Sequence, residues 1–181
     1  MKNNYHEIPL PDGVENVTTA SFLVFTEGPA VAGDGTLYFS DIPNNRILMR
    51  APTGVTSVWR DKSNRTNGQT FDKKGRLLHC EGAEFGHELG GRRVTRTDLK
   101  TGEYQVITDR YQGQRYNSPN DICVDGNGCI YFTDPCYDDR TIMEMDCDGV
   151  YRINTDGQVN RILTQPEIQR PNGIAVTQDS K

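Results

Sequence analysis

Long hydrophobic runs and clusters of basic residues are both absent from this sequence of 181 residues. No apolar stretch approaches the ~20 residues of a membrane-spanning helix, so we expect no contact with a membrane. Lysine and arginine total 20 against 25 aspartates and glutamates, without the basic patch that nucleic-acid binding needs. The N-terminal segment also lacks the apolar centre of a signal peptide, which predicts a cytoplasmic protein.

The short motifs of several large enzyme classes are missing as well. The chain has no G-x-S-x-G nucleophile elbow, no P-loop and no Rossmann glycine fingerprint. His87-Glu88 is not followed by a second histidine at helical spacing, so the zinc-protease pattern fails. The five cysteines form no C-x-x-C pair, so we expect reduced thiols. Cys123 and Cys129 flank a predicted turn at 126–128, and we interpret them as small buried hydrophobic residues.

What the sequence does contain is a strand–turn–strand unit, clearest in the segment 118–135. Two short runs of β-branched and aromatic residues flank the turn Gly126–Gly128, which is typical of a β-hairpin. The same unit occurs four times, and its copies begin 40, 53 and 52 residues apart. In each copy an Asn or Glu precedes the turn position by 8 residues; these are Glu27, Asn67, Asn120 and Asn172. Such a period with several strands per unit is typical of a β-propeller.

These four positions carry a chemical prediction. Equivalent positions in successive propeller blades lie on a ring around the central axis, so four oxygen-bearing side chains would converge there. Oxygen donors suit a hard cation such as calcium, which takes about six to eight oxygen ligands. The alternative is that each Asn only caps or turns the chain ahead of its strand.

The repeats organise the whole chain. We predict one all-β domain over residues 1–181, with repeats at about 27–60, 67–108, 120–163 and 172–181. An extra strand at 21–25 is predicted ahead of the first repeat. The glycine-rich segment 81–91 is interpreted as a solvated loop near the mouth of the propeller.

Several segments resemble one known family. In chain order they are TEGPAV, DGTLYFSDIPNNRI, RTNGQTFD, GRRVTRTD, SPNDICVD and RPNGIAV. They are similar to regucalcin (senescence marker protein), gluconolactonase and luciferin-regenerating enzyme, and most similar to the bacterial gluconolactonases. The resemblance implies a six-bladed β-propeller, of which this chain would cover blades 1–3 and the first strand of blade 4.

The resemblance also implies one divalent cation on the axis, most often calcium, with zinc, manganese and magnesium as alternatives. By motif, Glu27, Asn120 and Asn172 match three of the family's four metal ligands. Asn67 fits a substrate contact better than a metal ligand. Two further segments, 115–118 and 136–145, are predicted as loops at the mouth of the propeller. The other candidate substrate contacts lie in or beside them; they are Arg115, Asp134 and Asp138.

The family's fourth ligand, an Asp that is also its favoured general base, would lie beyond Lys181. The catalytic residue is therefore not assigned, and we expect the 181-residue chain alone to bind calcium poorly and to be inactive. Two interpretations stay open at this point: an incomplete copy of a longer protein, or a half-ring that pairs with another half. The sequence leaves the oligomeric state undetermined.

Three functions remain after this reasoning. The first is metal-dependent hydrolysis of a small-molecule sugar lactone or similar cyclic ester, as in gluconolactonase. The second is hydrolysis of phosphotriesters at the same type of metal site, because a Lewis acid serves a phosphoryl oxygen as well as a carbonyl. The third is a non-enzymatic binding propeller, since the Tyr-Phe-Ser-Asp and Tyr-Phe-Thr-Asp strand ends resemble those of receptor propellers.

Overall fold

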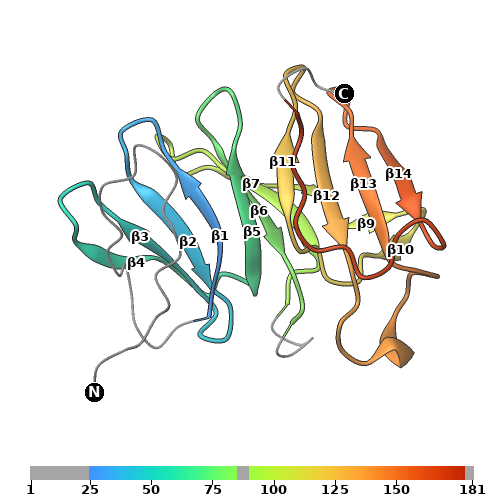
Figure 1. Ribbon diagram of the computed structural model, residues 1–181. Helices are drawn as coiled ribbons and strands as arrows, with labels where there is room; N and C mark the ends of the chain where they lie inside the picture. Colours follow the sequence, from blue (N-terminus) through green and yellow to red (C-terminus); the bar gives the residue numbers. More distant parts are fainter. Residues whose placement is uncertain (1–24, 85–89, 178–181) are drawn as a thin grey trace, which may run out of the picture.

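The computed structural model describes residues 25–84 and 90–177. Its main elements are three four-stranded antiparallel sheets, shown in Figure 1. The first sheet contains β1 (Thr26–Val31), β2 (Leu37–Asp41), β3 (Arg46–Arg50) and β4 (Thr56–Asp61). The second contains β5 (Thr66–Phe71), β6 (Leu77–Glu81), β7 (Arg93–Thr97) and β8 (Tyr104–Thr108). The third contains β11 (Ile122–Val124), β12 (Ile130–Asp134), β13 (Gly149–Ile153) and β14 (Val159–Thr164).

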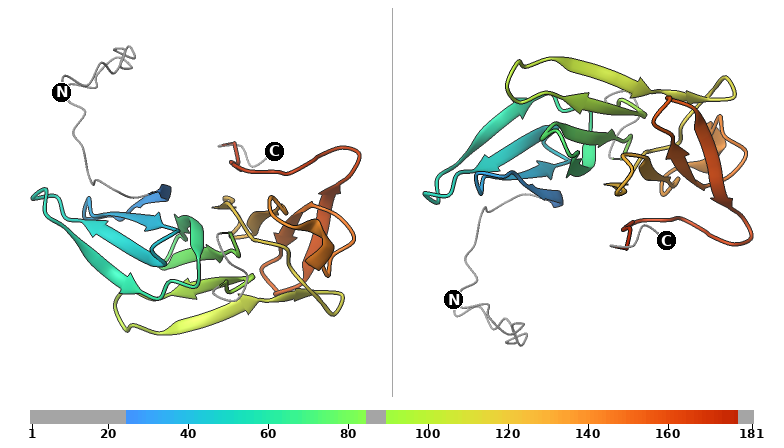
Figure 2. Two further views of the ribbon diagram at one scale, coloured as in Figure 1. Left: turned by 90° about the horizontal axis from the view of Figure 1, so that it is seen from below. Right: turned by 90° about the horizontal axis from the view of Figure 1, so that it is seen from above.

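Each sheet is a meander in which every strand pairs with the next one along the chain. The sheets match the first three predicted repeats, so we call them blades 1, 2 and 3. Viewed along the strands in Figure 2, the blades follow one another around an arc. The strands β1, β5 and β11 come first in their blades and lie next to one another, because β5 contacts both β1 and β11. The prediction of an all-β propeller fold is confirmed.

The fourth repeat differs from its prediction. The structure assigns no strand to residues 171–177, and residues 178–181 lie outside the described part of the chain. The segment nevertheless contacts blade 3, because Thr133 Oγ1 donates to the Asn172 carbonyl at 2.8 Å and Ile174 N donates to Asp121 Oδ2 at 2.8 Å. A strand needs a ladder partner, and this segment has none among the described residues. The extra strand predicted at 21–25 lies outside the description except for Phe25.

Two further segments correct the sequence interpretation. The linker after blade 2 contains a small hairpin of β9 (Arg110–Tyr111) and β10 (Gln114–Arg115). The supposed solvated loop 81–91 begins with a fully buried residue, because Glu81 is the last residue of β6. Its carboxylate accepts hydrogen bonds from Arg93 Nε and Tyr104 OH, each at 2.7 Å, and these partners compensate its burial. Residues 85–89 of that segment are outside the description. The described residues also contain a short 3-10 helix, Arg140–Ile142.

Aspartates stabilise five of the hairpin turns in the same way. At each of these turns the carboxylate accepts a hydrogen bond from the backbone N–H two residues further on, which is an Asx turn. The residues that do this are Asp34, Asp72, Asp98, Asp125 and Asp156. Asp34, Asp125 and Asp156 are each followed by glycine, so these three Asp-Gly pairs mark turns, whereas Asp148-Gly149 leads into β13.

The largest core cluster lies between blades 2 and 3. Tyr116 meets Phe132 edge-on at 5.1 Å, and Phe132 stacks on Tyr151 at 5.2 Å between ring centroids. All five cysteines are free thiols; Cys129 is buried as predicted, whereas Cys123 is only partly buried. No helix among the described residues has the length and apolar character needed to cross a bilayer.

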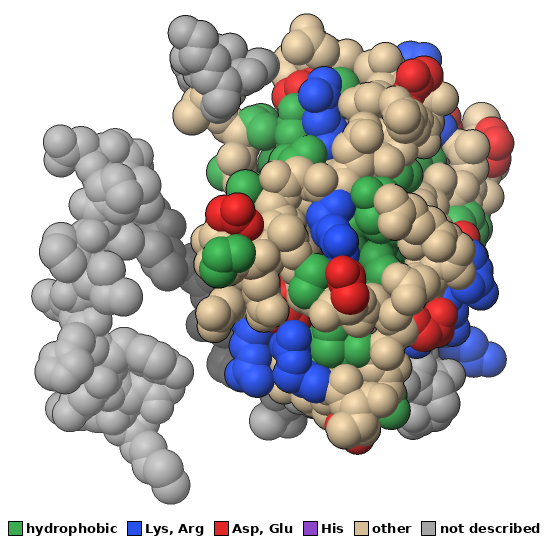
Figure 3. All heavy atoms as spheres, turned by 90° about the vertical axis from the view of Figure 1, so that its right-hand side faces the viewer, with side chains coloured by type: hydrophobic (Ala, Val, Ile, Leu, Met, Phe, Trp, Pro, Cys, Tyr) green, Lys and Arg blue, Asp and Glu red, His purple; other side chains and the backbone are tan. Residues whose placement is uncertain are grey.

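The outer edge of blade 3 is exposed. Ile162 and Leu163 of β14 are 44% and 45% exposed. Figure 3 shows that face of the molecule, where hydrophobic side chains are interspersed with both positive and negative ones. Charges on an edge strand disfavour pairing with a strand of another chain.

Glycines allow the first strands of the blades to approach closely. Gly28 follows Glu27, and Gly68 follows Asn67. A Cβ on Gly68 would lie 2.6 Å from the Asn120 carbonyl oxygen, and one on Gly28 would lie 2.3 Å from the Asn67 carbonyl oxygen. Both distances are shorter than van der Waals contact, so only glycine permits this backbone packing.

This packing gives a stability prediction. The substitution Gly68→Ala forces blades 2 and 3 apart and should lower the free energy of unfolding by about 2 kcal/mol, as overpacking does. Urea unfolding followed by circular dichroism measures the change. Gly33→Ala is the matched control, because a Cβ there meets nothing within 4 Å. Equal unfolding midpoints for the two variants would contradict the close-packing argument.

Candidate functional site

The four ring residues of the sequence analysis lie in neighbouring positions. Glu27 is in β1 and Asn67 in β5, while Asn120 stands two residues before β11. Gly68 N donates to the Asn120 carbonyl at 2.6 Å, so blades 2 and 3 meet at this level. The hydroxyl of Ser40 donates to the Asn67 carbonyl at 2.6 Å, just as Thr133 donates to Asn172. The same hydroxyl-to-carbonyl contact therefore occurs at two of the four ring residues, Asn67 and Asn172.

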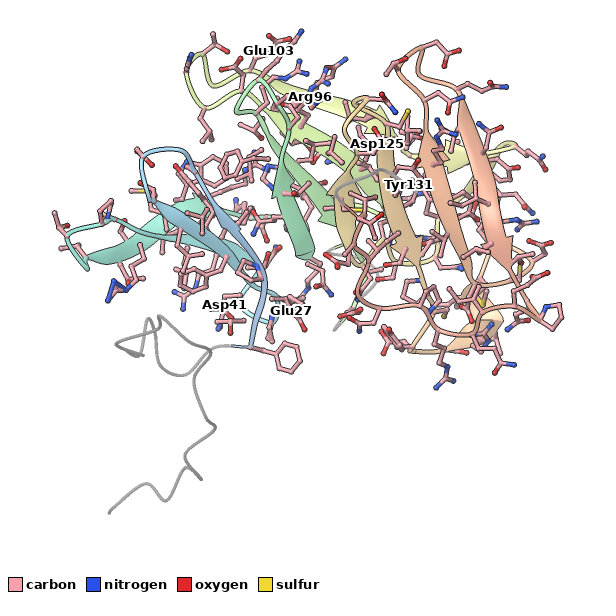
Figure 4. The ribbon with its side chains drawn as sticks, turned by 45° about the horizontal axis from the view of Figure 1, so that its top comes forward. Glu27, Asp41, Arg96, Glu103, Asp125 and Tyr131 are labelled. Atoms are coloured by element: carbon pink, nitrogen blue, oxygen red, sulfur yellow. The ribbon has the colours of Figure 1, made fainter. Side chains whose placement is uncertain are left out.

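The ring residues occupy one end of the propeller strands. Figure 4 shows Glu27 and Asp41 at this end, whereas Arg96 and Glu103 lie at the opposite end. We call the end that carries Glu27, Asn67, Asn120 and Asn172 the mouth.

Glu84 joins the mouth although the sequence analysis missed it. Its Oε1 accepts a hydrogen bond from Asn120 Nδ2 at 2.8 Å, and its Oε2 accepts one from Asn67 Nδ2 at 3.2 Å. Burial raises the pKa of Glu84; the Asn120 hydrogen bond opposes this rise, and the negative charges of Asp138 and Glu27 add to it. Asp138 and Glu27 therefore both lie within electrostatic reach of Glu84. The one available signal was the glutamate content of the segment 81–91, which has no periodicity to place any of its side chains.

Asn172 contacts the loop after blade 3's second strand. Its Nδ2 donates to Tyr137 OH at 3.0 Å. Burial raises the pKa of Tyr137, and the charge of Glu84 contributes to the rise, which places these two side chains within electrostatic reach. Asp138, the next residue, is exposed. Tyr137 thus lies between Asn172, to which it is hydrogen-bonded, and Glu84, whose charge it senses.

Asp134 has a structural position beneath the mouth. It is fully buried, and its carboxylate accepts hydrogen bonds from Asn117 N at 2.9 Å and Ser118 N at 2.8 Å. These bonds hold the loop that leads to Asn120. Burial raises the pKa of Asp134 to about 7. A substrate contact by Asp134 stays a prediction.

Arg115 links loops at the side of the mouth. Its Nη2 donates to the Gly91 carbonyl at 3.0 Å, and its backbone N–H donates to Glu144 Oε2 at 3.1 Å. The side chain is half-buried in these contacts. Its predicted contact with a substrate, like those of Asn67 and Asp138, stays a prediction.

The donor atoms of the mouth are chemically suited to a hard cation. Within residues 25–84 and 90–177, no three side chains of His, Cys, Asp or Glu gather closely enough to hold a metal on their own. The mouth instead combines carboxylates with asparagine amides. The amide nitrogens of Asn67 and Asn120 donate hydrogen bonds to Glu84. The amide oxygen of each side chain is therefore the atom left to bind a metal ion. An all-oxygen set of this kind fits calcium better than softer metals.

Together the fold and the mouth define a β-propeller with oxygen-bearing side chains gathered at one end, and comparison with known proteins identifies its family. The family model for the SMP-30/Gluconolactonase/LRE-like region matches residues 25–181. The chain belongs to this family, which confirms the resemblance seen in the sequence.

Individual relatives agree with the family match. A gluconolactonase from Zymomonas mobilis subsp. mobilis is 32% identical over 188 residues, covering 94% of this chain and 52% of that protein. The solved structure of a gluconolactonase from Xanthomonas campestris is 35% identical with a TM-score of 0.72, covering 87% of this chain and 52% of that one. A second solved structure in the gluconolactonase family is 29% identical with a TM-score of 0.79, covering 94% and 58%. The chain therefore spans about half the length of these relatives.

The buried carboxyl of Asp134 predicts a pH dependence of stability. Its pKa is about 7 in the folded protein and ~3.9 in an unfolded chain, so folding favours the protonated form. The stabilisation from this proton is fully present below pH ~4 and is lost as the pH rises through about 7. Asp134→Asn cannot ionise and should not show this loss.

The test is urea unfolding of both proteins between pH 4 and pH 8. The free energy of unfolding of the wild type should fall relative to that of Asp134→Asn as the pH rises. The contributions of all other carboxylates are the same in both proteins and cancel in the difference. Parallel pH profiles would show that Asp134 ionises normally in the folded protein.

Proposed function

We propose that the protein hydrolyses a sugar lactone or a similar cyclic ester with the help of one divalent cation, calcium in the first instance. The observation that carries the proposal is the set of oxygen-bearing side chains at one end of a gluconolactonase-family propeller. Glu27, Asn120 and Asn172 would hold the cation. When bound, it would supply a Lewis acid that polarises the ester carbonyl and stabilises developing negative charge.

The other side chains of the mouth favour a hydroxyl-rich substrate. Glu84 and Asp138 are acceptors for hydroxyl groups, and the Tyr137 phenol can both accept and donate. A sugar lactone is neutral and carries several hydroxyls, so it matches these groups without charge repulsion. The exposure of Asp138 gives it access to a ligand that enters from solvent.

A substrate panel tests the proposed reaction. The protein expressed from its own gene is assayed with aldonolactones and with phosphotriesters, by pH-indicator detection of the acid released. We expect at least tenfold higher kcat/KM for an aldonolactone, loss of activity in EDTA and recovery with calcium. A tenfold or greater preference for phosphotriesters would remove the lactonase proposal. Absence of both turnover and a bound ion would favour the non-enzymatic binding propeller.

A substitution at the ring tests the proposed ligand set. Asn120→Asp places a second carboxylate 2.8 Å from Glu84 Oε1 in place of an amide donor, so the local geometry must change. We expect kcat/KM for the lactone to fall at least tenfold and calcium affinity to change with it, as measured by calorimetry. Asn127→Asp is the control, because Asn127 lies exposed in the turn between β11 and β12. Unchanged turnover and affinity in Asn120→Asp would show that Asn120 is not a ligand.

A further inference from the structure

One carboxylate connects ring residues from two adjacent blades. Glu84 receives the amide nitrogen of Asn67 from blade 2 on one oxygen and that of Asn120, at the start of blade 3, on the other. The acceptor comes from neither strand, because Glu84 lies in the segment that follows β6. The contact therefore depends on the course of residues 82–84 after the end of β6.

This contact determines which end of each amide faces the mouth. An asparagine amide can turn about its last bond and exchange its oxygen for its nitrogen. An ionised carboxylate only accepts hydrogen bonds, so it selects the nitrogen of both amides. The oxygens are then left as the donor atoms for other partners, whereas a turned amide would present N–H groups that repel a cation.

We propose that Glu84 is a positioning residue that fixes the amides of Asn67 and Asn120 so that both offer oxygen at the mouth. This role rests on the proposed function for the nature of the ligand, a hard cation or a substrate hydroxyl. The orientation of the amides, however, is a property of the chain without any ligand. Asn120 is a proposed cation ligand, and Asn67 is a proposed substrate contact. One carboxylate would therefore orient a side chain for cation binding and another for substrate binding.

Placing the Glu84 carboxylate at the mouth costs free energy, because other negative charges lie near it. Glu84 is partly buried in the company of Glu27 and Asp138, and like charges disfavour one another. Two amide hydrogen bonds offset part of that cost, and a hard cation would offset more. A glutamate placed only to fill the loop would not need two amide partners from different blades.

Two carboxylate substitutions separate hydrogen bonding from charge. Glu84→Gln is nearly isosteric, but its amide can accept with oxygen only, so one of the two asparagines loses its acceptor or turns. Asp138→Asn is the matched control, because it removes the same charge from the mouth while both amides keep Glu84. Glu84→Asp keeps a carboxylate and should restore part of the effect.

The first measurement is NMR of the side-chain amide groups in the metal-free protein. We expect Glu84→Gln to shift the signals of Asn67 or Asn120, and Asp138→Asn to leave both in place, with equal unfolding midpoints showing that all variants fold. The second is titration with terbium as a calcium substitute. Affinity should fall at least tenfold in Glu84→Gln, less than threefold in Asp138→Asn, and by an intermediate factor in Glu84→Asp.

The outcomes distinguish this proposal from the lactonase proposal. Unchanged amide signals in Glu84→Gln would overturn the positioning role, as would equal losses of terbium affinity in Glu84→Gln and Asp138→Asn. If the wild type binds no terbium, the amide signals decide alone. A protein with shifted amide signals but no lactone hydrolysis would retain the positioning role and lose the proposed reaction.

Discussion

The close approach of the blades' first strands is the constraint on which the mouth depends. Gly68 N donates to the Asn120 carbonyl at 2.6 Å, at a position where no side chain larger than glycine's hydrogen fits. Backbone contact at this level brings Asn67, the residue before Gly68, next to Asn120 of the adjacent blade. Asn67 and Asn120 are near enough to share one carboxylate for this reason. The chemistry of the mouth is thus set by backbone packing before any ligand is considered.

A second layer of contacts repeats from blade to blade and keeps the ring residues in register. The second-strand hydroxyls Ser40 and Thr133 donate to the carbonyls of Asn67 and Asn172. In both pairs the donor belongs to the preceding blade and the acceptor is the ring residue of the next repeat. These side-chain bonds hold residues 172–177 against blade 3 even without a strand ladder. The ring position is therefore defined by the neighbouring blade as much as by its own.

The periodic part of this architecture was predictable from the sequence, because each blade is built from local signals. Alternating apolar residues and Asp-Gly turns mark the hairpins, and their spacing marks equivalent positions such as Glu27 and Asn67. The non-periodic part was not predictable. Glu84 reaches Asn120 across 36 positions of chain, and Glu81 is buried by Arg93 and Tyr104 from other strands. Nothing local in the segment 81–91 distinguishes such residues from glutamates in a solvated loop.

The negative charges at the mouth bear on which ligands the protein can select. Glu27, Glu84 and Asp138 bring three carboxylates to a place where burial raises the pKa of Glu84. The mouth can relieve their repulsion by taking up a proton or a cation, and its neighbouring amide oxygens suit the cation. One divalent ion against three carboxylates still leaves a negative balance when all are ionised. A phosphorylated or carboxylated ligand would add charge of the same sign, whereas a neutral polyol ester brings hydroxyl donors to the free carboxylate oxygens. If the proposed cation binds, the carboxylates that favour it would also favour an uncharged substrate over an anionic one.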